Sequence, residues 1–134
     1  MKKYFIFTLI FMLSTSFSHA EDVGVDYRCF VSTDSKIKMR IMWVSTSGWI
    51  GGYVQYGKHK EKIPIVQTRY KEEATDENSP YAVTSDWIEI IDGKINGGYH
   101  FGYQGANFSD VFYINKNGRK FTFSQALESY DDCF

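Results

Sequence analysis

Hydrophobic and polar residues alternate along much of this chain, and the alternation has the period of a β-strand. In residues 36–45 the apolar side chains share one face and the basic side chains the other: Ile37, Met39, Ile41 and Trp43 against Lys36, Lys38 and Arg40. A period of two indicates a strand with one buried face. Seven further segments favour strands, at residues 25–32, 49–56, 62–70, 81–91, 94–103, 108–115 and 119–123.

Turn signals separate these segments, the clearest being Asp92-Gly93 and Asn117-Gly118. About eight strands at regular spacing predict an all-β fold, a small antiparallel β-barrel or sandwich. Pro64 cannot donate a ladder hydrogen bond, so its strand is expected to lie at an edge or to carry a bulge. Residues 124–130 are expected to form one short C-terminal helical turn, with Ser124 as its N-cap.

Two glycine pairs lie inside predicted strands, Gly51-Gly52 and Gly97-Gly98. Paired glycines fit sharp bends or bulges that let a small barrel close. The longest polar stretch, residues 71–80, contains four acidic residues that would be costly to bury without partners. We expect this stretch to be a solvent-exposed loop.

The first 20 residues have the pattern of an export signal. Lys2 and Lys3 precede an apolar run at residues 4–13, and small residues follow, with Ser18 and Ala20 at the positions that a signal peptidase reads. The apolar run is about half of the roughly 20 residues needed to span a bilayer, which favours a cleaved signal over a membrane anchor. The prediction is a signal peptide at 1–20, one domain at 21–134, and a periplasmic or secreted product cleaved at about Ala20.

Charge and cysteine content narrow the function classes. Removing the two signal lysines leaves 13 Lys and Arg against 16 Asp and Glu, a formal charge of −3 that does not suggest a nucleic-acid partner.

Cys29 and Cys133 are the two cysteines, and in an oxidising compartment they most simply form one disulfide. The alternative, a redox or metal-binding pair, lacks a CxxC motif and nearby histidines.

No catalytic signature stands out. The two histidines beyond the signal, His59 and His100, lie in no hydrolase motif, and no phosphate-binding glycine loop follows a strand. The chain is therefore expected not to be an enzyme and to use no cofactor or metal. A pair of carboxylates for glycoside chemistry stays open as an alternative, because the separation it requires is spatial.

The segment 97–107 is the best candidate for a binding surface. Its candidate binding residues are Tyr99, His100, Tyr103, Gln104 and Asn107, which lie among glycines. Tyrosines and side-chain amides are favoured where proteins dock. The alternative interpretation is a glycine-bent barrel strand with buried tyrosines, in which Tyr99 and Tyr103 share one face and His100 lies on the other.

Three features stand out along the chain: Tyr27-Arg28-Cys29 near the start, Cys133 near the end, and a predicted β-meander between them. In these features the chain resembles the periplasmic and membrane-bound inhibitors of c-type lysozyme. The resemblance implies a small disulfide-stapled β-barrel that inserts a loop into the lysozyme active-site cleft. The family's inhibitory Ser-Gly-x-x-Tyr segment is not present, and Asn96-Gly97-Gly98-Tyr99 is only a degenerate counterpart.

The sequence thus predicts an exported periplasmic binding protein, foremost an inhibitor or protective protein against a cell-wall-active enzyme such as lysozyme. The partner would be a protein, a cell-wall hydrolase or a toxin. The alternatives are an immunity protein for a delivered toxin and a small-ligand carrier. An apolar cavity open at one end would favour the carrier, whereas a solidly packed barrel with a protruding polar loop would favour the inhibitor.

Overall fold

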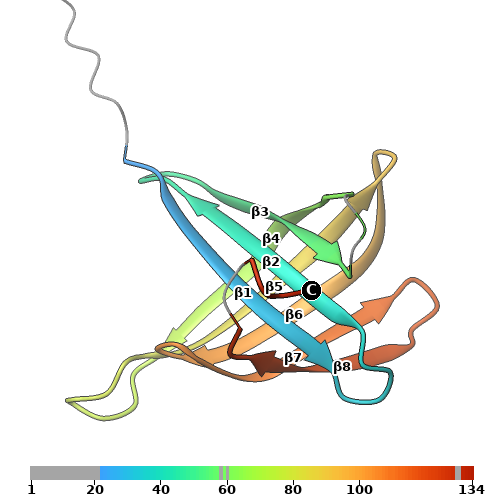
Figure 1. Ribbon diagram of the computed structural model, residues 1–134. Coiled ribbons are helices and arrows are strands. Elements are labelled where there is room, and N and C mark those ends of the chain that lie inside the picture. Colours follow the sequence, from blue (N-terminus) through green and yellow to red (C-terminus); the bar gives the residue numbers. More distant parts are fainter. Residues whose placement is uncertain (1–21, 58, 60, 129–130) are drawn as a thin grey trace, which may run out of the picture.

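The chain forms eight antiparallel strands in a single closed barrel (Figure 1). The structure is a computed structural model that describes residues 22–57, 59, 61–128 and 131–134. Its strands are β1 (Gly24–Ser32), β2 (Lys38–Ser45), β3 (Ile50–Tyr56), β4 (Ile63–Glu73), β5 (Ala82–Ile91), β6 (Lys94–Gln104), β7 (Asn107–Asn115) and β8 (Lys120–Ala126). The all-β prediction and each of the eight predicted strands are confirmed.

Each strand pairs with the next one along the chain, and β1 then pairs with β8 to close the barrel. The closing ladder is short: Cys29–Ser32 pair with Phe123–Ala126. Of the two architectures that the sequence left open, the structure is the barrel. Closure removes exposed sheet edges, which an open sheet of this size would present to other chains.

Alternate side chains of each strand point into the barrel and form an aromatic-rich core. The buried members of this core are Phe30, Met39, Ile41, Val54, Ile65, Trp87, Tyr99, Phe101, Phe108, Val111 and Phe123. Trp43 stacks on Phe108 with ring centroids 5.8 Å apart, and Phe30 meets Phe108 edge-on at 5.5 Å. These rings fill the middle of the barrel, as expected for an eight-stranded barrel with a narrow interior.

The strand of Pro64 was predicted to lie at a sheet edge or to carry a bulge, and the structure shows the bulge. The closed barrel has no edge strand, and β4 has a register shift against β5 between Gln67 and Arg69. Pro64 itself lies in the shortest ladder, where β3 and β4 pair through only three residues each. A residue without an N–H is tolerated where the ladder is this short.

The glycine pairs contribute to close packing and to a bulge, as the sequence indicated. A side chain at Gly52 would overlap the backbone carbonyl of Met42 on β2. Gly97 faces Glu89, and the β5–β6 register shifts immediately beyond that pair. Glycine is therefore required at Gly52, where the backbone of β2 lies too close for a side chain.

The predicted C-terminal helical turn at residues 124–130 is wrong. Ser124, Gln125 and Ala126 continue β8 and pair with β1. The pairing that closes the barrel uses the backbone groups that a helical turn would need, and this long-range requirement overrides the local N-cap signal. Residues 129 and 130, like the predicted signal peptide at 1–20, lie outside the described residues. No helix in the described part of the chain is long and apolar enough to cross a membrane.

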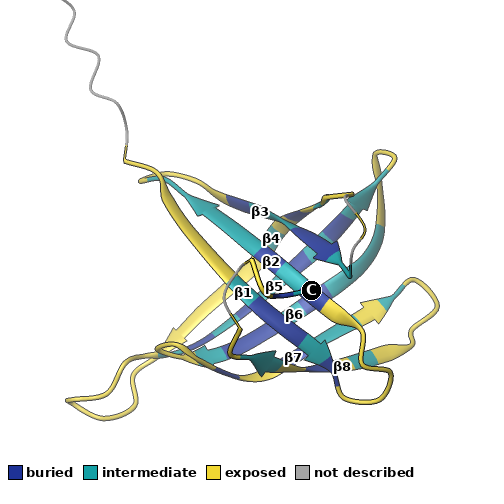
Figure 2. Cartoon of the chain, viewed as in Figure 1, coloured by how far each residue is buried: buried dark blue, intermediate teal, exposed yellow. Residues whose placement is uncertain are grey.

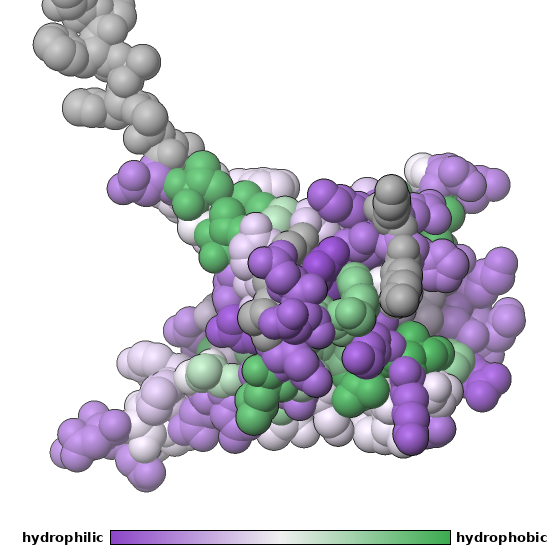
Figure 3. All heavy atoms as spheres, viewed as in Figure 1, coloured by the Kyte–Doolittle hydropathy of each residue, from purple (hydrophilic) through white to green (hydrophobic). Residues whose placement is uncertain are grey.

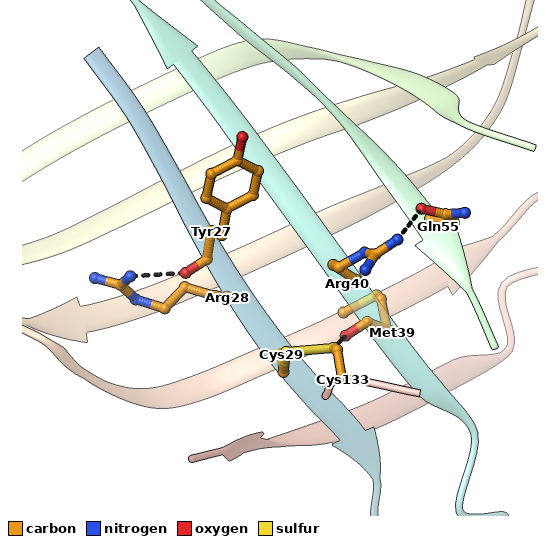
Figure 4. The surroundings of a disulfide bond; sticks show 7 residues. All are labelled: Tyr27, Arg28, Cys29, Met39, Arg40, Gln55 and Cys133. Carbon is orange, nitrogen blue, oxygen red and sulfur yellow. Dashed lines mark hydrogen bonds between the residues drawn. A yellow bond between two sulfur atoms is a disulfide. The ribbon is translucent and has the colours of Figure 1, made fainter. Parts of the chain in front are cut away.

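The predicted disulfide between Cys29 and Cys133 is confirmed, with the two Cα atoms 5.6 Å apart. Cys29 points outward from β1, and the C-terminal tail crosses the outer surface of β1 and β2 to reach it (Figures 1 and 4). The Arg40 guanidinium lies over the Phe134 ring at 4.6 Å and donates a hydrogen bond of 2.7 Å to Gln55 Oε1. The tail is therefore held by packing as well as by the covalent bond.

The polar stretch at 71–80 is exposed throughout, as predicted (Figure 2). Its first three residues are part of β4 rather than of a loop, because β4 and β5 pair out to Glu73 and Ala82. Lys71 and Glu73 form a salt bridge on this extension. Residues 74–81 connect β4 to β5, and this connection projects beyond the end of the barrel (Figure 1).

We expect the disulfide to supply a large share of the stability. Its two cysteines are 104 residues apart, and in the chain-entropy model a loop of that length stabilises the folded state by roughly 4 to 5 kcal/mol. Cys29→Ser should lower the free energy of unfolding by an amount of that order in urea titrations, and the double variant with Cys133→Ser should match it. Detection of two reactive thiols in the denatured, unreduced wild-type protein would contradict the bond.

Candidate functional site

A large cavity opens at one end of the barrel, the end formed by the turns that follow β1, β3, β5 and β7. We call this the cavity end. The cavity has a volume of about 740 Å³, within the range of roughly 300 to 1,000 Å³ that is typical of small-molecule sites. Its lining residues are Lys36, Ile37, Lys38, Tyr56, Gly57, His59, Glu89, Tyr113, Phe121, Phe123 and Phe134.

Two inward positions at the cavity end carry little or no side chain. Gly97 on β6 pairs with Glu89, and Ser32 on β1 pairs with Phe123. Any side chain at Gly97 would overlap the ring of Tyr113. The glycine therefore lets Tyr113 lie across β6, with its hydroxyl beside β5.

Among the described residues that line the cavity, Glu89 is the only acidic one, and it is buried with 3% of its surface exposed. Tyr113 donates a hydrogen bond to its carboxylate. The second carboxylate oxygen, Oε2, has no hydrogen-bond partner among the described residues. A buried carboxylate oxygen without a donor is costly, so this atom is the least satisfied polar group at the cavity.

Three tyrosine hydroxyls accompany this carboxylate. Tyr56 and Tyr99 are hydrogen-bonded through their hydroxyls, and Asn96 Nδ2 donates a bond of 3.3 Å to the Tyr113 hydroxyl. Burial is the main cause that raises the pKa of Tyr56, Tyr99 and Tyr113 above the usual tyrosine range, and the charge of Glu89 raises each of them further. The hydroxyls therefore stay neutral near pH 7 and act as hydrogen-bond donors and acceptors.

The rim of the cavity differs from its interior. Lys36, Lys38 and His59 are exposed there, together with Ile37. Phe134, held beside the mouth by the disulfide to Cys133, adds an aromatic ring to the rim. The site thus has a basic, solvated rim above aromatic walls and one buried carboxylate.

The opposite end of the barrel, which we call the hairpin end, holds a smaller pocket of about 310 Å³. Trp43, Trp87 and Tyr103 contribute to its walls, and Trp87 Nε1 donates a bond of 3.0 Å to Ser85. The central aromatic rings lie between this pocket and the cavity. The two ends therefore form separate sites.

The structure divides the predicted binding residues between the two faces of the barrel wall. Tyr99 and Tyr103 point inward, Tyr99 in the core and Tyr103 in the pocket at the hairpin end. His100 points outward, where its Nδ1 lies 2.6 Å from Asp86 and its Nε2 lies 3.4 Å from Asp110. Its ring stacks on Phe112 with a centroid distance of 4.7 Å. The predicted alternation between the tyrosines and His100 is confirmed.

Gln104 and Asn107 are exposed and pair with each other across the tight β6–β7 turn. Gln104 Nε2 donates to Thr75 Oγ1 at 3.0 Å and to the Pro80 carbonyl at 2.9 Å. It therefore anchors the 74–81 connection. The five predicted residues do not converge on one surface, and their role in binding stays a prediction.

Glu89 is not among the candidate residues predicted from the sequence. The available signal was weak. Glu89 lies two residues after Trp87 and so shares its face, but Ile88 and Ile90 make the opposite face equally apolar. The local pattern of β5 does not distinguish the inner face from the outer one.

Comparisons with protein-family models, with curated proteins and with solved structures find no match to this chain. Within the part of the chain that the structure describes, no group of three or more His, Cys, Asp or Glu side chains is placed to hold a metal ion. Function is therefore inferred from the geometry of the cavity and of the hairpin end.

The raised tyrosine pKa values predict a loss of stability at alkaline pH. The folded chain keeps protons that the unfolded chain releases above the ordinary tyrosine pKa of 10.0. The stabilising contribution is therefore fully present below that pH and is lost as the pH rises above it. Tyr99→Phe should flatten the decline in urea midpoints between pH about 9 and about 11, whereas Tyr81→Phe, at an exposed position, should follow the wild-type curve. Identical curves for all three proteins would contradict the linkage.

Proposed function

We propose that this chain is an exported binding protein whose barrel holds a small, largely apolar ligand at its cavity end. The observation that carries the proposal is the cavity itself, about 740 Å³ in volume, open at one end and walled mainly by aromatic rings. A barrel that served only as a scaffold would gain stability by filling this space with side chains. A preformed concave apolar site is the usual form of a small-molecule site.

The fold supports a rigid site. The cavity residues come from strands of a closed barrel, and the disulfide fixes Phe134 beside the mouth. A site built on strands loses little conformational entropy when a ligand binds. The signal-like pattern of the first 20 residues supports binding in the periplasm or outside the cell, an oxidising environment in which the Cys29–Cys133 bond would be stable.

The proposal predicts saturable binding of an uncharged apolar dye. N-phenyl-1-naphthylamine should bind the chain at a stoichiometry of about one, with the rise in fluorescence that follows transfer from water to an apolar site. Ile37→Ala should weaken binding about fivefold, because it removes part of the apolar rim. The measurement is a fluorescence titration with direct excitation of the dye.

Ile114→Ala is the matched control, since Ile114 and Ile37 are both 40% exposed but Ile114 does not line the cavity. Its affinity should equal that of the wild type. No saturable binding, or equal loss of affinity in the two variants, would overturn the cavity as the binding site.

A second candidate function, docking to a protein, is favoured by the 74–81 connection at the hairpin end. This polar segment projects from the barrel, and Gln104 fixes it through two hydrogen bonds (Figure 1). A preorganised polar loop can enter the cleft of a partner at low entropic cost. The face in Figure 3 is mainly hydrophilic, with its apolar residues in small separate patches, so this face offers a partner no broad apolar surface. A cell-wall-active enzyme such as lysozyme, or a delivered toxin, is the expected partner.

Inhibition assays with a c-type lysozyme test this second candidate. The chain should inhibit the enzyme, and Gln104→Ala should weaken inhibition severalfold because it frees the projecting segment from its anchor. Asn107→Ala, at the partner position in the same turn, should have a smaller effect. Full inhibition by a variant with residues 75–79 replaced by a short glycine linker would contradict a role for this segment.

A further inference from the structure

The cavity contains a feature that an apolar ligand alone does not explain, the buried carboxylate of Glu89. Glu89 is 3% exposed and lines the cavity, and its Oε2 atom has no hydrogen-bond partner among the described residues. No salt bridge to Glu89 is formed by any Lys, Arg or His that the structure describes. Taking a carboxylate out of water without a cation is unfavourable. The cavity thus holds a carboxylate that forms no salt bridge with the described part of the chain.

The position of Glu89 is specified by its surroundings. Gly97 lies directly across from it on β6 and leaves room for the ring of Tyr113, whose hydroxyl donates to the carboxylate. Asn96 in turn donates to that same hydroxyl. Neighbours on two adjacent strands therefore orient the carboxylate, which is how a binding group is held in a fixed geometry.

The walls around this carboxylate are aromatic. Among the described residues, five aromatic side chains line the cavity: Tyr56, Tyr113, Phe121, Phe123 and Phe134. The face of an aromatic ring attracts a cation by about 0.5 to 2 kcal/mol, with the larger values at desolvated sites. Aromatic rings combined with a carboxylate are suited to an organic cation with an apolar body.

The rim sets a limit on the charge of such a ligand. Lys36 and Lys38 are exposed at the mouth, where water and salt screen their charges. Glu89 lies in a less polar environment, where the same charge acts more strongly. The rim lysines oppose a second positive charge near the mouth, so the site favours a single charge that reaches the interior.

We propose that the cavity end selects a monocationic amine with an apolar, ring-bearing or alkyl body, and that its ammonium group pairs with Glu89. This inference deepens the proposed function and depends on the cavity being a ligand site. The ammonium group of the amine supplies the hydrogen-bond donor that Glu89 Oε2 lacks, while the apolar body of the amine contacts the aromatic walls. The ligand binds without any covalent step.

Three probes with the same phenylbutyl body separate the contribution of charge from that of apolar contact. They are 4-phenylbutylamine, 4-phenylbutan-1-ol and 5-phenylpentanoate, which end in an ammonium, a hydroxyl and a carboxylate group. In isothermal titration calorimetry with the whole chain, the amine should bind at least tenfold more tightly than the alcohol, and the carboxylate should bind most weakly. A tenfold preference is of the size expected for one charge-assisted hydrogen bond.

Glu89→Gln should abolish the preference for the amine and leave the affinity for the alcohol within about twofold, because glutamine keeps the shape of the side chain. Glu61→Gln is the matched control. It changes the net charge equally, but Glu61 is exposed and does not line the cavity. The preference for the amine should survive in this variant.

A measurement on the unaltered chain keeps the inference testable if Glu89→Gln does not fold. The side-chain carboxyl ¹³C resonance of Glu89 should shift on addition of the amine and stay in place on addition of the alcohol. Absence of a shift with the amine would overturn the pairing.

The outcomes separate this inference from the proposed function. If the amine binds no more tightly than the alcohol, or if the carboxylate binds most tightly, the inference is wrong, while saturable binding of the alcohol or of the neutral dye leaves the ligand site intact. If neither the dye nor any of the three probes binds, the proposed ligand site is wrong and this inference fails with it.

Discussion

The pairing of β1 with β8 is the interaction on which the rest of the structure depends. It joins residues about 90 positions apart in the chain through four residue pairs, Cys29–Ser32 with Phe123–Ala126. A short ladder between distant segments is entropically expensive to form. The disulfide acts at the same place, because Cys29 is itself a member of the closing ladder and Cys133 lies on the tail that crosses it. Closure and the covalent bond together fix the interior space in which the cavity lies.

The interior of the barrel is filled unevenly, and this unevenness creates the sites. Bulky rings such as Phe30, Phe101 and Phe108 meet in the middle, whereas a cavity of about 740 Å³ stays open at the cavity end. Tight packing in the middle stabilises the fold, and the open end gives up part of that stabilisation. A cavity that costs stability and is lined by oriented groups is typical of a functional site.

Electrostatics distinguishes the two ends. At the cavity end, Glu89 is enclosed by aromatic rings and neutral hydroxyls, and the basic groups remain at the solvated rim. At the hairpin end, the charged residues of the 74–81 connection are exposed and surrounded by water. A charge acts far more strongly in the first environment than in the second. This difference is why we propose a small charged ligand for the cavity and protein recognition for the projecting segment.

The sequence by itself determined the eight strands and the alternation of side chains between their two faces, because both follow from a local period of two. It also determined the cysteine pair, because the chain has only two cysteines. It also placed Tyr99 and Tyr103 on the face opposite His100. Only the tertiary structure decided that the sheet closes as a barrel and that Ser124 to Ala126 extend β8, since both depend on pairing between distant segments. The location of Glu89 was decided in the same way. Both faces of β5 are apolar near Glu89, and only closure of the barrel determines which of them becomes the interior.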